Sequence, residues 1–205
     1  MNIGWLAFGK MGEPMALRMT ADGNGVPVFD VSDGRRAAAR VVESLGGPLA
    51  SADAIVSSLL NDAVAPLIPA DAGSPLQQEK PGALLIETSI ISVGASASIA
   101  DTAATRQFPC LQVPISGSVM AAANGMLTTF ISGHEALIKR AWPIVSTYST
   151  TIRILGNAKQ ARVMRLAVNL MVTTLVVGLG EVHALWTKGG IAPKDDGCAA
   201  MRVHC

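Results

Sequence analysis

A run of small residues near the start of the chain has the composition and spacing of a dinucleotide-binding turn. An apolar run at 3–6 precedes it, a helix-like segment follows, and a second apolar run ends at Asp30. Such a turn lets the backbone approach a pyrophosphate, which the following helix N-terminus attracts through its N–H groups and dipole. Asp30 lies about twenty residues further on, where a carboxylate can accept hydrogen bonds from a ribose 2′-hydroxyl. We therefore expect dinucleotide contacts from Asp30 and from Ala7, Phe8, Gly9, Lys10, Met11 and Gly12.

The turn departs from the usual G-x-G-x-x-G pattern at its first position. Ala7 replaces the glycine that serves the tight turn. Gly9 and Gly12 keep the positions that serve the approach to the pyrophosphate and the helix–strand packing. Alanine adds only a methyl group, so we expect a weakened site rather than an abolished one. The alternative is an ordinary strand–turn–helix with incidental glycines.

The first 156 residues alternate between strand-like and helix-like segments. Strand-like runs follow the opening unit at 54–60, 83–87, 110–113, 127–132 and 151–155, and helix-like runs at 32–43, 92–105 and 135–146. This alternation indicates an α/β fold with a mostly parallel sheet covered on both faces. We assign residues 1–156 to an NAD(P)-binding domain of the Rossmann type, a doubly wound sheet.

A long apolar helix is predicted at 159–188, and two glycines end it. A helix this apolar must pack against more protein, in the same chain or in another subunit. Its most apolar part, 166–179, is shorter than the roughly twenty residues of a membrane span, so we expect a buried helix and no membrane contact. We assign residues 157–205 to a truncated all-α domain for substrate binding and dimerisation. A homodimer or larger homo-oligomer is expected through this helix.

Composition excludes some classes of function. The net charge is +1 and only 15% of the residues are charged, which is not the basic footprint of a nucleic-acid-binding protein. The three cysteines show neither paired nor metal-ligand spacing, which favours a reducing compartment and no metal centre. No basic region or cleavage site precedes the first strand, so we expect a cytoplasmic protein.

Four segments in order resemble the β-hydroxyacid dehydrogenase family, which includes 3-hydroxyisobutyrate dehydrogenases and related imine-reducing enzymes. They are the turn at 9–16, the strand and its end at 52–62, the Pro-Ile-Ser-Gly segment at 113–118 with 125–128, and the long helix region at 156–191. The resemblance implies substrate contacts from Ser116, Gly117 and Ser118. It also implies further cofactor contacts from Leu59, Leu60, Ser89 and Ile90.

The main departure from the family concerns its catalytic lysine, whose position is taken by Arg165, with Asn169 four residues later on the same helix face. A desolvated lysine can lose its proton, whereas an arginine essentially cannot. Arg165 can bind a carboxylate or polarise a carbonyl, but it is a poor proton shuttle. The acidic residue before the Pro-Ile-Ser-Gly segment is here Gln112, and one hydroxyl near the cofactor is replaced by Ile90.

The expected function is NAD(P)-dependent hydride transfer to or from a small β-hydroxyacid or carbonyl substrate, weakened by Arg165. Ser116 would hold the substrate carboxylate and Asn169 would orient the reacting oxygen. Two alternatives stay open: a dinucleotide-binding protein without turnover, and a reductase of imines or ketones that needs no lysine. Asp30 predicts NAD over NADP, because a carboxylate repels a 2′-phosphate. Arg35 and Arg36 are the residues that could swing toward such a phosphate.

Overall fold

The structure is a computed structural model that describes residues 2–7, 9–21, 26, 28–29, 52–59, 82–105, 107–156 and 159–191. The chain divides into two compact units, Met1–Arg165 and Leu166–Cys205. Three of the residues expected at the cofactor site lie outside the described residues: Phe8, Asp30 and Leu60.

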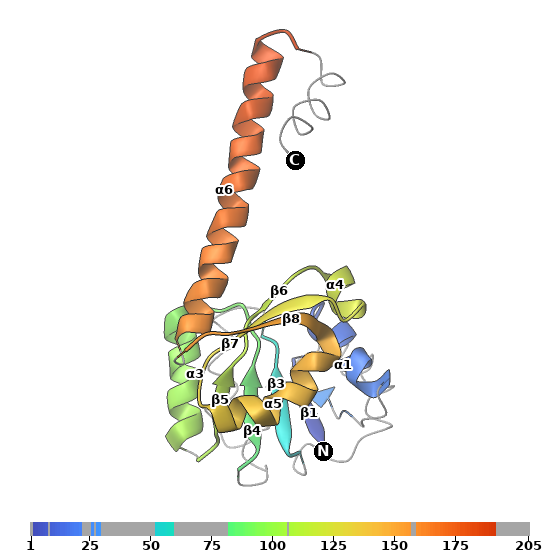
Figure 1. Cartoon of the computed structure of the whole chain (residues 1–205), viewed down its shortest axis with the longest axis vertical. Helices are drawn as coiled ribbons and strands as arrows, with labels where there is room; N and C mark the ends of the chain where they lie inside the picture. Colours follow the sequence, from blue (N-terminus) through green and yellow to red (C-terminus); the bar gives the residue numbers. More distant parts are fainter. Residues whose placement is uncertain are drawn as a thin grey trace. The chain divides into compact units, whose positions relative to one another are not determined.

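Five short strands of the first unit form one sheet with the order β2-β1-β3-β4-β5. Figure 1 labels β1, β3, β4 and β5 of this sheet. The strands are β1 (Ile3–Leu6), β2 (Val28–Phe29), β3 (Ala54–Ser57), β4 (Leu84–Glu87) and β5 (Cys110–Gln112). Each neighbouring pair is parallel. The predicted Rossmann-type α/β fold followed by a long helix is therefore confirmed.

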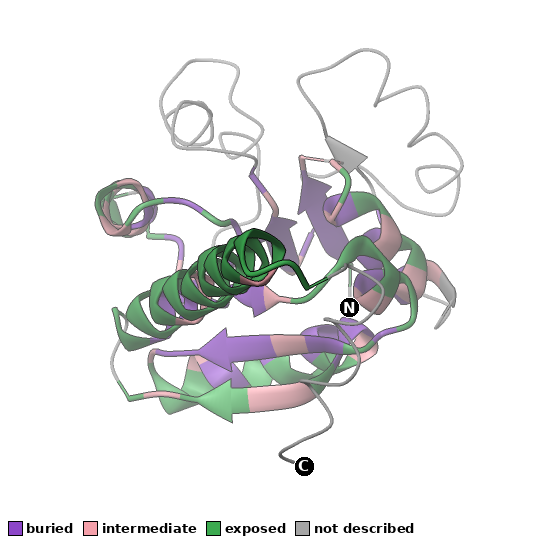
Figure 2. Cartoon of the chain, turned by 90° about the horizontal axis from the view of Figure 1, so that it is seen from above, coloured by how far each residue is buried: buried purple, intermediate pink, exposed green. Residues whose placement is uncertain are grey.

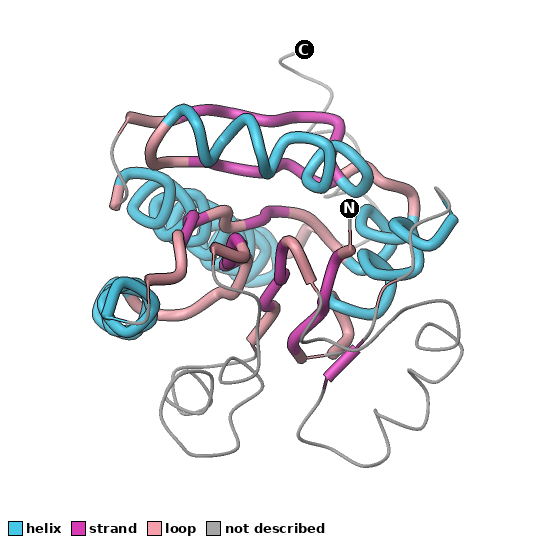
Figure 3. Tube along the Cα trace, turned by 90° about the horizontal axis from the view of Figure 1, so that it is seen from below, coloured by secondary structure: helices cyan, strands magenta, loops and turns pink. Residues whose placement is uncertain are grey.

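Both faces of this sheet are covered, which explains why its central strands read as continuous apolar runs. On one face Trp5, Val56 and Ile86 join a cluster with α1 (Gly12–Ala21) and α5 (Glu135–Tyr148). On the other face Leu6, Ile55 and Leu85 pack with α3 (Val93–Thr105). Figure 3 shows these helices on opposite sides of the strands. The carboxyl ends of the strands then form one edge, where such folds bind their ligands.

The later strands form a second, mixed sheet rather than extending the first. It has the order β6-β7-β8, with β6 (Ile115–Ser116) antiparallel to β7 (Leu127–Ile131) and β7 parallel to β8 (Ser149–Ile154). A single bridge from Gln112 to Ser132 links β5 to this sheet. A short helix, α4 (Val119–Ala123), connects β6 to β7. The sequence did not reveal β6 or α4, because elements of two and five residues show no periodicity.

The last described helix, α6 (Gln160–Lys188), begins in the first unit, where Ala161, Arg162 and Arg165 are buried. Within the second unit its apolar side chains are exposed (Figure 2), up to 69% for Leu170 and 70% for Leu185. The described residues of this chain therefore do not bury the helix, and burial against another subunit stays a prediction. The whole helix, with 29 residues, is also long and apolar enough to cross a membrane, although soluble proteins contain such helices too.

Candidate active site

The turn between β1 and α1 closes tightly at the carboxyl edge of the sheet. Ala7 has a φ of 69°, the left-handed conformation that favours glycine. The Ala7 carbonyl accepts a hydrogen bond from Trp5 Nε1 at 3.2 Å. Gly12 starts α1 against this carbonyl, and a Cβ at Gly12 would lie 2.5 Å from Ala7 O. Gly12 therefore has the packing role that the pattern predicts, and Ala7 occupies a strained position.

The described residues of this edge fit a bound dinucleotide. The N-terminus of α1 faces the turn, with Glu13 N donating to Gly9 O at 2.9 Å. Ser57 Oγ, at the end of β3, is buried without a hydrogen-bond partner among the described residues. A helix N-terminus attracts a phosphate, and a buried hydroxyl that lacks a partner suits a polar ligand. Of the other turn residues, Met11 packs against the core and Lys10 is exposed.

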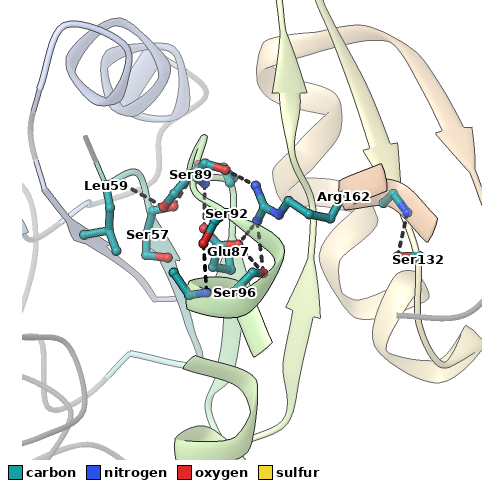
Figure 4. Close-up of polar contacts among 11 residues, drawn as sticks. Ser57, Leu59, Glu87, Ser89, Ser92, Ser96, Ser132 and Arg162 are labelled. Carbon is teal, nitrogen blue, oxygen red and sulfur yellow. Dashed lines mark hydrogen bonds and ion pairs between the residues drawn. The ribbon is translucent and has the colours of Figure 1, made fainter. Parts of the chain in front are cut away.

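The turn that follows β4 is held by a buried network of polar side chains (Figure 4). Glu87, at the end of β4, accepts hydrogen bonds from Ser89 N at 2.7 Å and from Ser96 Oγ at 3.3 Å. Arg162, at the start of α6, forms an ion pair with the Glu87 carboxylate, and both side chains are 1% exposed. Burial raises the pKa of Glu87, while the Arg162 charge and the hydrogen bonds from Ser89 and Ser96 oppose that rise.

Ser89 is fixed by its backbone and by its side chain. Its N–H donates to Glu87, its Oγ accepts from Leu59 N at 2.8 Å, and its carbonyl accepts from Arg162 Nη1. The next residue, Ile90, is 43% exposed. Ser89 therefore anchors the turn and ties it to the end of β3, while Ile90 faces outward. Cofactor contacts from Leu59, Ser89 and Ile90 stay predictions.

The sequence did not reveal Arg162 as part of this edge. Arg162 and Glu87 are separated by 75 positions, so no local spacing connects them. An arginine in the first turns of a helix is ordinarily a solvated charge. A carboxylate that ends an otherwise apolar, buried strand was the one available signal, because a buried charge requires a partner.

The expected substrate segment lies where β6 leads into α4. Ser116 is half-buried and pairs with Thr128 on β7. Gly117 has a φ of 143°, and a Cβ there would lie 2.7 Å from Leu127 Cδ2, so this turn requires glycine. Ser118 Oγ caps α4 by accepting a hydrogen bond from Ala121 N at 3.2 Å. The segment thus has a defined shape, and its substrate contacts stay predictions.

Arg165 lies near the start of α6 and is 7% exposed. Burial, together with the nearby charge of Arg162, lowers the pKa of Arg165, although a guanidinium stays protonated at neutral pH. Asn169 follows on the same helix in the second unit. The structure therefore brings Arg165 into the first unit beside Arg162. Among the described residues no group of His, Cys, Asp and Glu could hold a metal ion.

Comparison with known proteins identifies the family. Residues 2–156 match the family described as the NAD binding domain of 6-phosphogluconate dehydrogenase. A 2-(hydroxymethyl)glutarate dehydrogenase from Eubacterium barkeri is 26% identical over 94% of this chain and 66% of its own length. The solved 3-hydroxyisobutyrate dehydrogenase of Mycobacterium tuberculosis with L-serine is 25% identical, with a TM-score of 0.83 over 95% of this chain and 67% of that one. An imine reductase from Myxococcus stipitatus shares the fold, at 15% identity and a TM-score of 0.82 over 95% of this chain and 68% of that one.

These matches confirm the resemblance to hydroxyacid dehydrogenases that the four sequence segments indicated. The chain spans 66% of the length of the Eubacterium barkeri relative. The family match covers the β1–α1 turn, the turn after β4 and the second sheet, and it ends before α6. The chain thus belongs to the family of the NAD binding domain of 6-phosphogluconate dehydrogenase, and its first 156 residues contain an NAD-binding domain.

Proposed function

We propose that this chain transfers hydride between NAD(H) and a small β-hydroxyacid, at a rate limited by Arg165. The observation that carries the proposal is the β1–α1 turn, where Gly12 and the left-handed Ala7 bring the N-terminus of α1 to the carboxyl edge of the sheet. This arrangement suits a pyrophosphate. The named activities of the hydroxyacid dehydrogenases described above support the choice of substrate class.

The proposed roles of the residues follow from their chemistry. A bound nicotinamide supplies the carbon that accepts or donates the hydride. Ser116 and Gly117, with Ser118 beside them, bind the substrate carboxylate, and Asn169 orients the reacting oxygen. Arg165 places a fixed positive charge near that oxygen and polarises it. Because this guanidinium does not release a proton at neutral pH, proton transfer is the weak step.

Two other functions remain as alternatives. The substitution of arginine for a proton-shuttling lysine favours a protein that binds a dinucleotide without turnover. A reductase of imines or ketones is the second, and the fold shared with an imine reductase supports it. Steady hydride transfer with a panel of hydroxyacids supports the dehydrogenase, transfer with imines or ketones alone supports the reductase, and cofactor binding without transfer supports the binding protein.

We also propose that the chain forms a homodimer or larger homo-oligomer and that it is located in the cytoplasm. The exposed apolar side chains of α6 support association, because so large an apolar surface is rarely left in water. Light scattering should show a species larger than a monomer at micromolar concentration. A well-behaved monomer would contradict the proposed oligomer, and a chain recovered only from membranes would contradict the proposed cytoplasmic location.

Calorimetric titration with NAD and NADP, followed by absorbance at the nicotinamide band with hydroxyacids, tests the whole proposal. NAD should bind more tightly than NADP, because Asp30 repels a 2′-phosphate. Gly12→Ala should abolish this binding, and Gly94→Ala, at the start of α3, is the matched control. An unmodified chain that binds neither cofactor refutes the proposal.

A further inference from the structure

One guanidinium at the start of α6 joins two parts of the candidate site that lie far apart in the sequence. Arg162 Nη1 donates to the carbonyl of Ser89, in the turn after β4. Arg162 Nη2 donates to the Glu87 carboxylate and, at 3.2 Å, to Ser96 Oγ on α3. The geometry points to Arg162 as a positioning residue that holds the turn after β4 in the shape that receives the nicotinamide half of the cofactor. This inference rests on the proposed function.

The strand order assigns the turn after β4 to the nicotinamide half. The pyrophosphate belongs at the β1–α1 turn, and the adenosine ribose belongs at the end of β2. The order β2-β1-β3-β4-β5 places β3 and β4 on the other side of β1. A dinucleotide that extends across β1 therefore reaches the ends of β3 and β4 with its nicotinamide half. Ser89 and Ile90 form the turn at that position.

The contacts of Ser89 show how Arg162 controls this turn. Ser89 is held by three hydrogen bonds: its N–H donates to Glu87, its Oγ accepts from Leu59 N, and its carbonyl accepts from Arg162. A movement of the turn must therefore break a buried hydrogen bond. Arg162 also belongs to the first turns of α6, close to Arg165. The Arg162 side chain thus fixes both the turn after β4 and the start of α6, the helix that carries Arg165.

Stability alone does not account for this network. Removing a guanidinium and a carboxylate from water opposes folding, and an apolar pair of similar volume often stabilises a protein as well or better. An arginine fork, however, reaches two acceptors in fixed directions, which neither a lysine nor an apolar side chain can do. The network therefore holds the turn after β4 in one conformation, which is what the binding of a cofactor at this turn requires.

The test compares binding of NADH with binding of ADP, which occupies only the adenine side of the site. Arg162→Met leaves the Glu87 carboxylate without its cation and lowers the thermal unfolding midpoint. The double variant Arg162→Met with Glu87→Met removes both charges and recovers part of the midpoint, because Ser89 N and Ser96 Oγ still lose their acceptor. We expect the double variant to bind NADH about tenfold more weakly than the unmodified chain, since a small misplacement can have this effect. Its affinity for ADP should not change.

Two further variants complete the experiment. Arg140→Met is the matched control, because Arg140 Nη2 donates to Gly82 O at 2.9 Å near the opposite end of β4. This variant should bind both ligands like the unmodified chain. Arg162→Lys keeps the charge but loses the fork, so NADH binding should weaken about fivefold relative to ADP binding. Arg162→Lys decides the question if the double variant does not fold.

Several results would overturn the inference. A folded double variant or Arg162→Lys variant that binds NADH as tightly as the unmodified chain shows that Arg162 is only structural. An equal loss of NADH and ADP binding shows a general disturbance of the domain. An unmodified chain that binds neither ligand refutes the proposed function together with this inference, and that failure is distinguishable because it precedes any substitution.

Discussion

The two turns at the carboxyl edge of the parallel sheet are built in different ways. The turn after β1 takes its shape mainly from local backbone, through the left-handed Ala7 and the absent side chain of Gly12, with one hydrogen bond from the nearby Trp5 side chain. The turn after β4 is held by side chains from β4, α3 and α6. The first turn needs only its own residues in order, whereas the second requires the tertiary fold. The two turns should therefore respond differently to substitution.

The largest expected effect is at the second turn. Arg162→Met leaves a buried carboxylate without its cation, which should lower the free energy of unfolding by about 3–5 kcal/mol. Urea unfolding at neutral pH measures the change. Arg140→Met, which removes an exposed arginine near the other end of β4, should change it by less than about 0.5 kcal/mol. Similar losses in the two variants would show that the buried pair has no special role.

The pH dependence of this loss sharpens the comparison. Burial raises the pKa of Glu87, and without Arg162 the rise becomes larger. A carboxyl group whose pKa is higher in the folded state contributes its full stability below the unfolded pKa, and the contribution is lost as the pH rises through the folded pKa. The stability difference between the unmodified chain and Arg162→Met should therefore be small near pH 4 and grow toward pH 7. A difference that stays constant over this range contradicts the ion pair.

At the first turn, Gly12→Ala tests the backbone instead. The added Cβ would lie 2.5 Å from a carbonyl oxygen of the backbone, which cannot rotate away as a side chain can. We expect a loss of about 1–3 kcal/mol in unfolding free energy and no measurable NAD binding. The control Gly94→Ala meets only Ser92 Oγ at 3.9 Å and should keep both properties. Normal NAD binding by Gly12→Ala would remove the main support for the cofactor site.

The substitution Arg165→Lys tests whether the residue at the start of α6, close to the second turn, takes part in catalysis. A lysine restores an ionisable group at this buried position, and general acid–base help is typically worth about 10²–10⁴-fold. We expect oxidation of a β-hydroxyacid to increase at least about tenfold in a folded chain that binds NAD. Initial rates of hydroxyacid oxidation by the unmodified chain and by Arg165→Lys, at equal saturation with NAD, measure the increase. No change under these conditions would show that the catalytic assignment is wrong.

The same difference between the turns explains what the sequence could predict. The parallel sheet and the β1–α1 turn follow from local patterns, because their apolar runs and glycines lie close together along the chain. The network of Glu87 and Arg162 joins residues separated by 75 positions. Glu87 ends an apolar strand and so needs a partner, but nothing in the sequence identifies Arg162 as that partner. The sequence analysis assigned the strands of the second sheet to the first sheet, because the residue pattern of a strand indicates that the strand exists but not which strand it pairs with.

The smallest expected effect concerns the strain at Ala7. A left-handed φ of 69° disfavours an alanine and is open to glycine, although glycine also gains freedom in the unfolded chain. Ala7→Gly should therefore raise the unfolding free energy by only about 0.5–1 kcal/mol. Gln107, with a φ of 60° in the loop after α3, is the matched control, and Gln107→Gly should give a similar gain. Ala7→Gly should also bind NAD more tightly, because the methyl group is expected to weaken the cofactor turn, whereas Gln107→Gly, in the loop after α3, should leave NAD affinity unchanged. A loss of stability in Ala7→Gly alone would mean that the methyl group packs favourably, and that the first turn, like the second, depends on its side chains.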